Sequence, residues 1–345
     1  MKYFHIPLLV VLSVVFVFSS CSKKSGETEN SEGKKINVIS VNFPGYDFAR
    51  EIAGDKINLT LLLPPGAESH SFEPTPQDII KIQNGDIFIY VGGESDSWVK
   101  SVLESAGNKD MKVIAMMDQV KTVKEEMKEG MEEGEDRHGH DEHKDGDKNE
   151  DGRGHDGNDE NHKEDHAEEA EYDEHVWTSP LNAVKIVEAI ERALSAADRA
   201  NAEIYKMNAE AYTQKLMQLD ASFREAAGNA KRKIIIFGDR FPFRYFADEY
   251  GLDYYAAFPG CSTETEASAK TVAFLIDKVK KEKVPAVFHI EFSNGKIAET
   301  ISESTGAKNL LLHSCHNISA DELQRGESYI NIMSRNLSAL KEALD

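Results

Sequence analysis

Five histidines outside the N-terminus and the acidic middle of the chain are the residues best suited to chemistry. They are His70, His175, His289, His313 and His316. Each lies at or beyond the end of an expected strand or in a loop, and none lies on the apolar face of an expected helix. Imidazole is a common ligand for zinc, copper, iron and nickel, and three imidazoles suit zinc in particular. A single histidine more often has a structural role, but five near strand ends favour a metal site.

The middle of the chain is acidic and holds most of the remaining histidines. Residues 131–170 contain 17 acidic and 5 basic residues. Because residues 122–171 lack apolar periodicity, we interpret them as a disordered insertion. Six histidines lie within it: His138, His140, His143, His155, His162 and His166. Imidazoles among carboxylates can hold several metal ions weakly, although the same composition also suits a plain solvated loop. The formal net charge of −21 argues against nucleic acid as a partner.

Strands and helices are expected to alternate on both sides of the insertion. Before it, apolar runs predict strands over 36–44, 57–66, 86–93 and 111–118, separated by helices. After it, strands are expected over 233–239, 252–260, 285–293 and 308–314, again with helices between them. This alternation predicts an α/β fold of two lobes, 36–178 and 231–345, each with a mainly parallel sheet and flanking helices. The helical pattern over 179–230 predicts a stiff connection between the lobes.

The N-terminus carries the pattern of an export signal. A positive Lys2 is followed by an apolar run over residues 6–18, then by two serines and Cys21. The run is short for a membrane span, so residues 1–20 are interpreted as a signal peptide. We expect Cys21 to become lipidated, which would anchor the exported protein to the cell membrane, facing away from the cytoplasm. Residues 21–35 would then be a flexible tether.

The two remaining cysteines allow two interpretations. In an exported protein, a disulfide between Cys261 and Cys315 is the default expectation. Alternatively, Cys315 is a soft zinc ligand beside His313.

Three segments resemble the motifs of one protein family. They are GAESHSFEPTPQD at 66–78, GGESDSWV at 92–99 and DEHVWTSPLNA at 173–183. Together they resemble the zinc- and manganese-specific solute-binding lipoproteins of metal ABC transporters, many of which have an acidic, histidine-rich insertion before the third motif. In that motif Glu174 stands where the family usually has proline. The resemblance implies that one long helix joins the lobes and that the metal lies in the cleft between them.

The family implies four ligand positions, of which two are matched directly by His70 and His175. Counting along the chain places Arg240 at the third position and His313 at the fourth. Arginine cannot ligate a metal, because it offers no lone pair.

Three other residues are therefore considered as ligands: Asp239, Glu291 and His316. The alternative that we favour slightly is that Arg240 pairs with Glu291 or Asp239 behind the ligands, leaving three histidines and one oxygen around the ion. His289 is expected on the same side of its strand as Glu291, also behind the ligands.

The expected function is high-affinity capture of a transition-metal ion outside the cytoplasm and its delivery to the membrane permease of an ABC importer. Zinc is favoured over manganese, which prefers more carboxylate oxygen. A binding protein is expected rather than an enzyme, and a monomer rather than an oligomer. A metal-dependent hydrolase with Glu291 as general base is the main alternative. A manganese-specific binding protein or a surface adhesin are the others.

Overall fold

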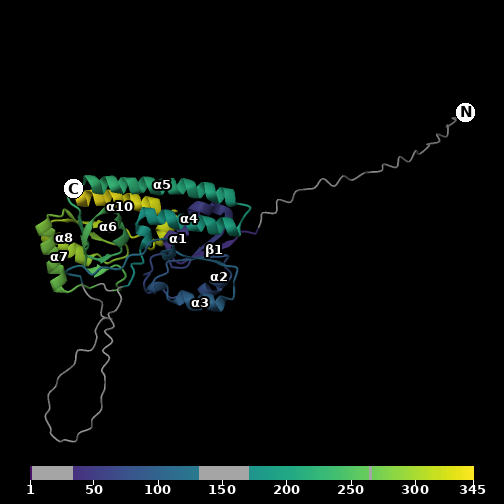
Figure 1. Ribbon diagram of the computed structural model, residues 1–345, viewed down its shortest axis with the longest axis horizontal. Coiled ribbons are helices and arrows are strands. Elements are labelled where there is room, and N and C mark those ends of the chain that lie inside the picture. Colours follow the sequence, from purple (N-terminus) through teal and green to yellow (C-terminus); the bar gives the residue numbers. More distant parts are fainter. Residues whose placement is uncertain (2–33, 132–170, 264–265) are drawn as a thin grey trace, which may run out of the picture. The chain divides into compact units, whose positions relative to one another are not determined.

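The computed structural model describes Met1 and residues 34–131, 171–263 and 266–345 (Figure 1). The predicted signal peptide, the lipidation of Cys21, most of the tether and the histidines of the insertion lie outside the described residues. Residues Lys35–Asp345 form one compact unit. Nowhere in the described ranges is a helix both long and apolar enough to cross a bilayer.

The first lobe is built on a parallel sheet of four strands. Its strands follow the order β2-β1-β3-β4 and are β1 (Asn37–Ser40), β2 (Asn58–Leu61), β3 (Ile87–Tyr90) and β4 (Lys112–Ala115). Its helices are α1 (Phe43–Ala53), α2 (Pro76–Gln83) and α3 (Trp98–Ala106). Neighbouring side chains point to opposite faces of the sheet, so Val38 joins the core beneath α1, whereas Ile39 joins the apolar cluster that also holds Ile82 and Val99. Both faces of the sheet are therefore covered, as a parallel sheet requires.

Local sequence signals set where the helices begin. Thr75 accepts a hydrogen bond from the backbone of Asp78, and the Asp78 side chain accepts one from the backbone of Thr75. This capping box, with proline at the first helical position, starts α2 directly after the loop that carries His70. Ser179 caps the next helix in the same way, directly after the loop that carries His175. Capping therefore fixes where the loops that carry His70 and His175 end and where the next helices begin.

Two consecutive helices connect the lobes. After the short turn η5 (Val176–Thr178), they are α4 (Pro180–Ala197) and α5 (Ala202–Asn229). Helix α4 packs on α1 and β4 of the first lobe, while α5 packs on α1 and α4 and also on α6 and α10 of the second lobe. Figure 1 shows α5 running above α4 and α10. The long connecting helix implied by the sequence is thus α5.

The second lobe contains parallel strand pairs. Its strands are β5 (Ile234–Ile236), β6 (Arg240–Phe241), β7 (Asp253–Tyr255), β8 (Phe258–Pro259), β9 (Ala286–His289) and β10 (Lys308–Leu311). A parallel bridge between Phe237 and Phe288 joins the β5–β7 pair to the β9–β10 pair. Its helices are α6 (Arg244–Tyr250), α7 (Ala269–Glu282), α8 (Lys296–Thr305), α9 (Ala320–Gln324) and α10 (Tyr329–Leu344). The expectation of two α/β lobes with mainly parallel sheets is confirmed.

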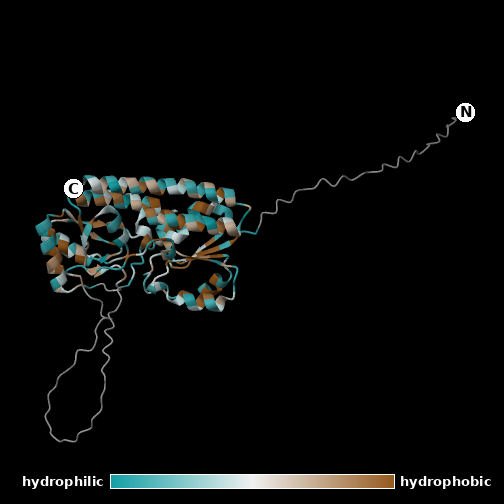
Figure 2. Ribbon diagram, in the orientation of Figure 1, coloured by the Kyte–Doolittle hydropathy of each residue, from teal (hydrophilic) through white to brown (hydrophobic). Residues whose placement is uncertain are grey.

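One apolar core runs through both lobes. It includes Val38 and Phe48 of the first lobe, Leu216 of α5, and Phe237 and Leu340 of the second lobe. Figure 2 shows the hydrophobic strands enclosed by helices with hydrophilic outer faces. Burial of this shared apolar surface holds the lobes together, so the loops between them have fixed positions.

The edges of the expected insertion belong to the folded unit. Lys124 forms an antiparallel bridge with Tyr172, and Glu125 accepts a hydrogen bond of 2.8 Å from the backbone of Cys261. The described part of 122–171 therefore takes part in the fold, in contrast to the prediction that the whole segment is disordered. Sequence patterns could not indicate this, because the segment is joined to the fold by single backbone and side-chain contacts and has no apolar periodicity.

Candidate metal centre

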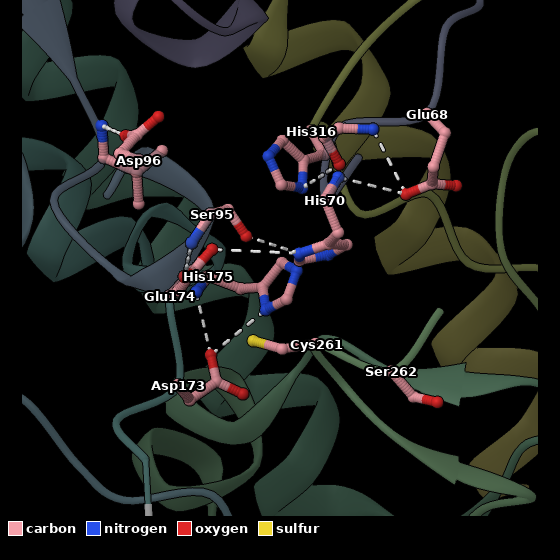
Figure 3. Close-up of polar contacts among 12 residues, drawn as sticks. Glu68, His70, Ser95, Asp96, Asp173, Glu174, His175, Cys261, Ser262 and His316 are labelled. Atoms are coloured by element: carbon pink, nitrogen blue, oxygen red, sulfur yellow. Dashed lines mark hydrogen bonds and ion pairs between the residues drawn. The ribbon is translucent and has the colours of Figure 1, made fainter. Parts of the chain in front are cut away.

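Three histidine rings from both lobes meet in one place. His70 lies in the loop between β2 and α2, His175 precedes η5, and His316 follows β10. Their ring centroids form a nearly equilateral triangle, with separations of 5.3 Å for His70–His175, 5.2 Å for His70–His316 and 5.3 Å for His175–His316. One ring nitrogen from each lies within 4.8 Å of the other two, and Figure 3 shows the rings turned toward one another. Small rearrangements would bring these nitrogens to about 2.0–2.1 Å from a zinc ion.

Each ring is held through its Nδ1 atom. Nδ1 of His70 is 3.0 Å from the hydroxyl of Ser95, and Nδ1 of His316 is 3.0 Å from the hydroxyl of Ser69. Nδ1 of His175 is 3.2 Å from a carboxylate oxygen of Asp173, which also accepts a hydrogen bond of 2.8 Å from the His175 backbone. A neighbour that accepts the Nδ1 proton leaves the lone pair on Nε2, the arrangement usual for histidines that bind metals.

Burial and charge divide the three imidazoles into two kinds. Burial lowers the pKa of His70 to about 3, with His175 and Arg240 acting in the same direction. Burial likewise lowers the pKa of His316. Burial also disfavours the charged form of His175, but the carboxylates of Asp173, Glu174 and Glu125 outweigh it and raise the pKa. Two of the three rings therefore keep their lone pairs free at neutral pH, and the third competes with a proton.

The loop of His316 is fastened to the rest of the site from several directions. The indole of Trp177 donates a hydrogen bond of 2.8 Å to the carbonyl of Ser314. The Asn317 side chain donates to the carbonyls of Pro64 and Ala67, at 2.8 and 3.0 Å. These bonds tie the second lobe to the loop that carries His70, so the three rings are positioned before an ion arrives.

Between the rings lies a cavity of about 30 Å³, lined among others by the three histidines, Arg240 and Glu291. A space of this size holds one water molecule or one ion. The imidazole nitrogens, a small cavity and buried surroundings therefore fit a single transition-metal ion.

Arg240 is paired with an unexpected residue. Its guanidinium donates two hydrogen bonds to the carboxylate of Glu68, at 3.1 and 3.0 Å, and a third to the carbonyl of Ser262. The Glu68 carboxylate also accepts from the backbones of Ser69 and His70, at 3.1 and 3.4 Å. The expectation that Arg240 pairs with Glu291 or Asp239 is wrong, because the first lobe supplies a better placed carboxylate. Through Glu68, Arg240 holds the loop of His70.

His313, expected as the fourth ligand, lies outside the group of three rings. Its Nδ1 atom accepts a hydrogen bond of 3.0 Å from the backbone of Cys315 and lies 3.4 Å from Glu291. The Asn336 side chain bonds both its backbone N–H and its carbonyl. His313 thus serves the structure of the loop, and His316, three residues later, takes its place beside His70 and His175.

The other candidate residues are engaged elsewhere. Asp239 accepts from the backbones of Arg240 and Ile290, and both carboxylate oxygens of Glu291 accept from Ser314. Nδ1 of His289 contacts the Asn309 side chain, at 2.7 Å. The carboxylates of Asp239 and Glu291 are thus hydrogen-bonded within the second lobe. His289 contacts a residue of β10 and none of the three grouped histidines.

The expected disulfide is absent from the described chain, where Cys261 and Cys315 are both free thiols. Cys315 is fully buried in the shared core, whereas Cys261 lies with His70 and Glu174. Because the two side chains occupy different surroundings, neither reaches the other, and Cys315 is also no ligand beside His313. Burial, together with Asp173, Glu125 and Glu174, raises the pKa of the Cys261 thiol.

Several residues of the site gave only weak signals in the sequence. The hydroxyls of Ser69 and Ser95 and the carboxylates of Glu68 and Asp173 all lie inside the three motifs, next to residues that were singled out. Their roles depend on contacts between separate loops, and the residue types alone do not reveal them.

Two α/β lobes with three converging imidazoles in the cavity between them define a two-lobed metal-binding protein. The family described as "Zinc-uptake complex component A periplasmic" matches residues 38–343, and this chain belongs to that family. The resemblance drawn from the three motifs is therefore confirmed.

Named relatives and solved structures agree with this assignment. The high-affinity zinc uptake system protein ZnuA of Bacillus subtilis strain 168 is 34% identical over 338 residues, which cover 98% of this chain and 97% of that protein. Zinc-binding lipoprotein AdcA of Streptococcus pneumoniae R6 is 32% identical over 98% of this chain, which spans only 60% of that longer protein.

Among solved structures, the Zn(II)-bound ZnuA-like domain of S. pneumoniae AdcA matches with a TM-score of 0.68 and 29% identity, over 90% of this chain and all of that domain. The metal-dependent lipoprotein YcdH of B. subtilis matches with a TM-score of 0.69 and 30% identity, over 90% of this chain and 99% of that structure.

Proposed function

We propose that this protein captures a zinc ion outside the cytoplasm and delivers it to the permease of an ABC importer. The observation that carries the proposal is the triangle of His70, His175 and His316, each ring held through Nδ1. Relatives named as zinc uptake and zinc-binding proteins support the choice of metal and the link to transport. A set of three imidazoles also favours zinc over manganese.

The ligand set that we propose differs from the one expected from the sequence. His316 replaces His313, and Arg240 binds Glu68 instead of the metal or a carboxylate of its own lobe. The fourth position is left for an oxygen or sulfur ligand, because no further imidazole of the described chain joins the group.

The family and the N-terminal pattern support a proposal for how the protein is attached to the membrane. We propose that the mature protein is a monomer held at the outer side of the cell membrane by lipid on Cys21, with residues 21–35 as a tether. Such an arrangement keeps the loaded protein near its permease by raising its effective concentration there.

Transport is favoured over hydrolysis by the surroundings of the only residue suggested as a base. Glu291 accepts hydrogen bonds from the backbone and the hydroxyl of Ser314 with its two oxygens. A general base must instead reach a metal-bound water.

A metal titration tests the proposal. The full chain is stripped with a chelator and titrated with Zn²⁺ or Mn²⁺ in competition with a chelator of known affinity, and the bound metal is counted by elemental analysis. We expect one tight zinc equivalent and manganese binding weaker by about 100-fold or more. A protein without a tight zinc equivalent, or with equal affinity for both ions, would refute the proposal. His289→Ala is the matched control, because its ring lies on β9 against Asn309.

A further inference from the structure

One buried carboxylate oxygen beside the histidines lacks a partner. Glu174 is only 2% exposed, and among the described residues its Oε2 atom has no hydrogen-bond partner. The other oxygen, Oε1, accepts a hydrogen bond of 2.9 Å from the backbone of Ser95. Leaving a buried charged oxygen unpaired is costly. Oε2 lies 3.8 Å from Nδ1 of His70, so the unpaired atom faces the imidazole of a proposed metal ligand.

The chain makes room for this side chain. A methyl group placed on Gly93 would lie 2.2–2.5 Å from atoms of the Glu174 side chain. Only glycine therefore allows the loop of 92–97 to wrap the carboxylate this closely. In the related motif the position of Glu174 is usually proline, which has no carboxylate, so the feature belongs to this chain rather than to the general pattern.

A thiol completes a second group around His70. The Cys261 sulfur, a carboxylate oxygen of Glu174 and a ring nitrogen of His70 all lie within 4.8 Å of one another. Figure 3 shows the sulfur pointing toward the histidines. Gly260 before it also lies in close quarters, since a methyl group there would be 2.9 Å from the carbonyl of Phe241 and 3.2 Å from Asp173.

We propose that Glu174 and Cys261 form, with His70, a second set of metal ligands, and that a soft divalent ion in this cleft takes the Cys261 sulfur as a ligand. This inference deepens the proposed function and rests on it. A thiolate, a carboxylate and an imidazole together suit zinc and its thiophilic relatives such as cadmium, and disfavour manganese. The sulfur binds as thiolate, so binding releases the thiol proton to solvent.

The second set of ligands shares His70 with the group of three histidines, so it influences which metal ion the cleft binds. An ion held by His70, His175 and His316 alone would be chosen by nitrogen affinity, which many divalent metals satisfy. Adding a sulfur and an oxygen next to the same imidazole biases the cleft toward metals that accept thiolate. Charge adds affinity without choosing among divalent ions, because Asp173, Glu174 and Glu125 lie near Cys261 and attract a cation.

Cobalt spectroscopy tests the assignment, since Co²⁺ replaces zinc and shows a sulfur-to-metal charge-transfer band in the near ultraviolet when thiolate is bound. The full chain carries Cys21→Ser throughout, to remove the third thiol, and receives less than one equivalent of Co²⁺ so that the tightest site fills first. Cys261→Ala is compared with Cys315→Ala, the matched control, whose thiol lies in the core. X-ray absorption of the zinc-loaded protein measures the same contact directly, as a sulfur at about 2.3 Å.

We expect the charge-transfer band and the sulfur in the parent protein, their loss in Cys261→Ala and their persistence in Cys315→Ala. Zinc affinity should fall about tenfold or more in Cys261→Ala and in Glu174→Gln, which keeps the contact to Ser95. Tight cobalt or zinc binding without sulfur would overturn the assignment and leave the proposed function intact. Absence of any tight complex would overturn the proposed function itself. The parent protein alone shows whether sulfur is bound, through the charge-transfer band and the zinc–sulfur distance. A variant that fails to fold therefore does not prevent the test.

Discussion

The carboxylate of Glu68 and the guanidinium of Arg240 form a two-pronged ion pair across the two lobes, with N–O distances of 3.1 and 3.0 Å. The pair joins the loop that carries His70 to strand β6 of the second lobe. Glu68 also accepts from two backbone N–H groups of its own loop. Arg240 cannot bind a metal, but through this pair it fixes the loop that carries His70. Its positive charge also neutralises the carboxylate of Glu68.

This pair should contribute measurably to stability. In a double-mutant cycle with Glu68→Ala and Arg240→Ala, we expect a coupling of about 0.5–1 kcal/mol in the free energy of unfolding of the metal-free protein. The value is modest because the Glu68 side chain is 40% exposed. The exposed pair of Lys308 and Glu342 is the control, with coupling near zero. Denaturant titration measures both, and additive single variants at the first pair would contradict the expectation.

The coupling should also depend on pH. Burial alone would raise the pKa of Glu68, but the bonds and charge of Arg240 outweigh it and lower the pKa to about 2. A carboxyl group whose pKa is lower in the folded state stabilises the fold above its ordinary pKa of 4.5, and this stabilisation is lost as the pH falls toward 2. The cycle repeated at about pH 3 should therefore give a smaller coupling than at neutral pH.

Alanine substitution of two nearby histidines distinguishes the ligand set expected from the sequence from the one that we propose. We expect His316→Ala to weaken zinc binding by about 100-fold or more, as should His70→Ala and His175→Ala, because each removes a nitrogen from the ion. His313→Ala should weaken it much less, since that ring only supports the loop. Competition titration gives the affinities, and circular dichroism checks folding. A larger loss in His313→Ala than in His316→Ala would show that His313 is the ligand, as expected from the sequence, and that His316 is not.

Much of the fold could be predicted from the sequence, because its signals are local. Strand-like runs alternate with helices that begin at recognisable caps, such as Thr75 before Pro76 and Ser179 before Pro180. Two of the three grouped histidines, His70 and His175, lie only five and four residues before those caps. The structure therefore reproduces the alternation of strands and helices and the helix starts that these local patterns indicate.

The rest could not be predicted because it depends on chain reversals and distant pairs. Cys315 has a φ of 63°, a conformation that favours glycine, and nothing in its residue type indicates it. That turn lies between His313 and His316, so spacing alone could not show which of them faces the cavity. Glu68 and Arg240 are 172 positions apart, and Cys261 was considered only as half of a disulfide. Composition and periodicity carry no information about such contacts.

Removing the acidic, histidine-rich segment should leave the tight site intact. The contacts at its edges define where to cut: Lys124 bridges Tyr172, and Glu125 accepts a hydrogen bond from Cys261. We expect deletion of residues 132–170, with a short Gly/Ser link, to give a folded protein with one tight zinc equivalent and fewer weak ones. Deletion of 122–171 should instead lower stability and zinc affinity. Titration calorimetry of both proteins distinguishes these outcomes, and loss of the tight site in the shorter deletion would show that the segment supplies a ligand.

Zinc affinity should fall with acid through one histidine. The pKa of His175 is raised above its ordinary 6.5, because the charge of Asp173 and its neighbours outweighs burial. Burial lowers the pKa of His70 to about 3 and lowers that of His316. As the pH falls through the pKa of His175, a proton occupies that ring and must leave before zinc binds, while the other two rings stay free. In a Cys261→Ala background, which removes the proton of the proposed thiolate ligand, the affinity should therefore decrease about tenfold per pH unit below that pKa, which corresponds to one proton.

Asp173→Asn is the variant that tests this cause. The amide can still accept from the His175 backbone, as the carboxylate does at 2.8 Å, but the charge that favours the imidazolium is gone. The pKa of His175 should fall, so the decline in affinity should begin at a lower pH than in the parent protein. Asp118→Asn, an exposed carboxylate, is the control and should leave the profile unchanged. Zinc dissociation constants from about pH 8 to about pH 5, corrected for protonation of the competing chelator, give both profiles. In the Cys261→Ala background, a slope of two protons, or identical profiles with and without Asp173→Asn, would show that His175 is not the group that titrates.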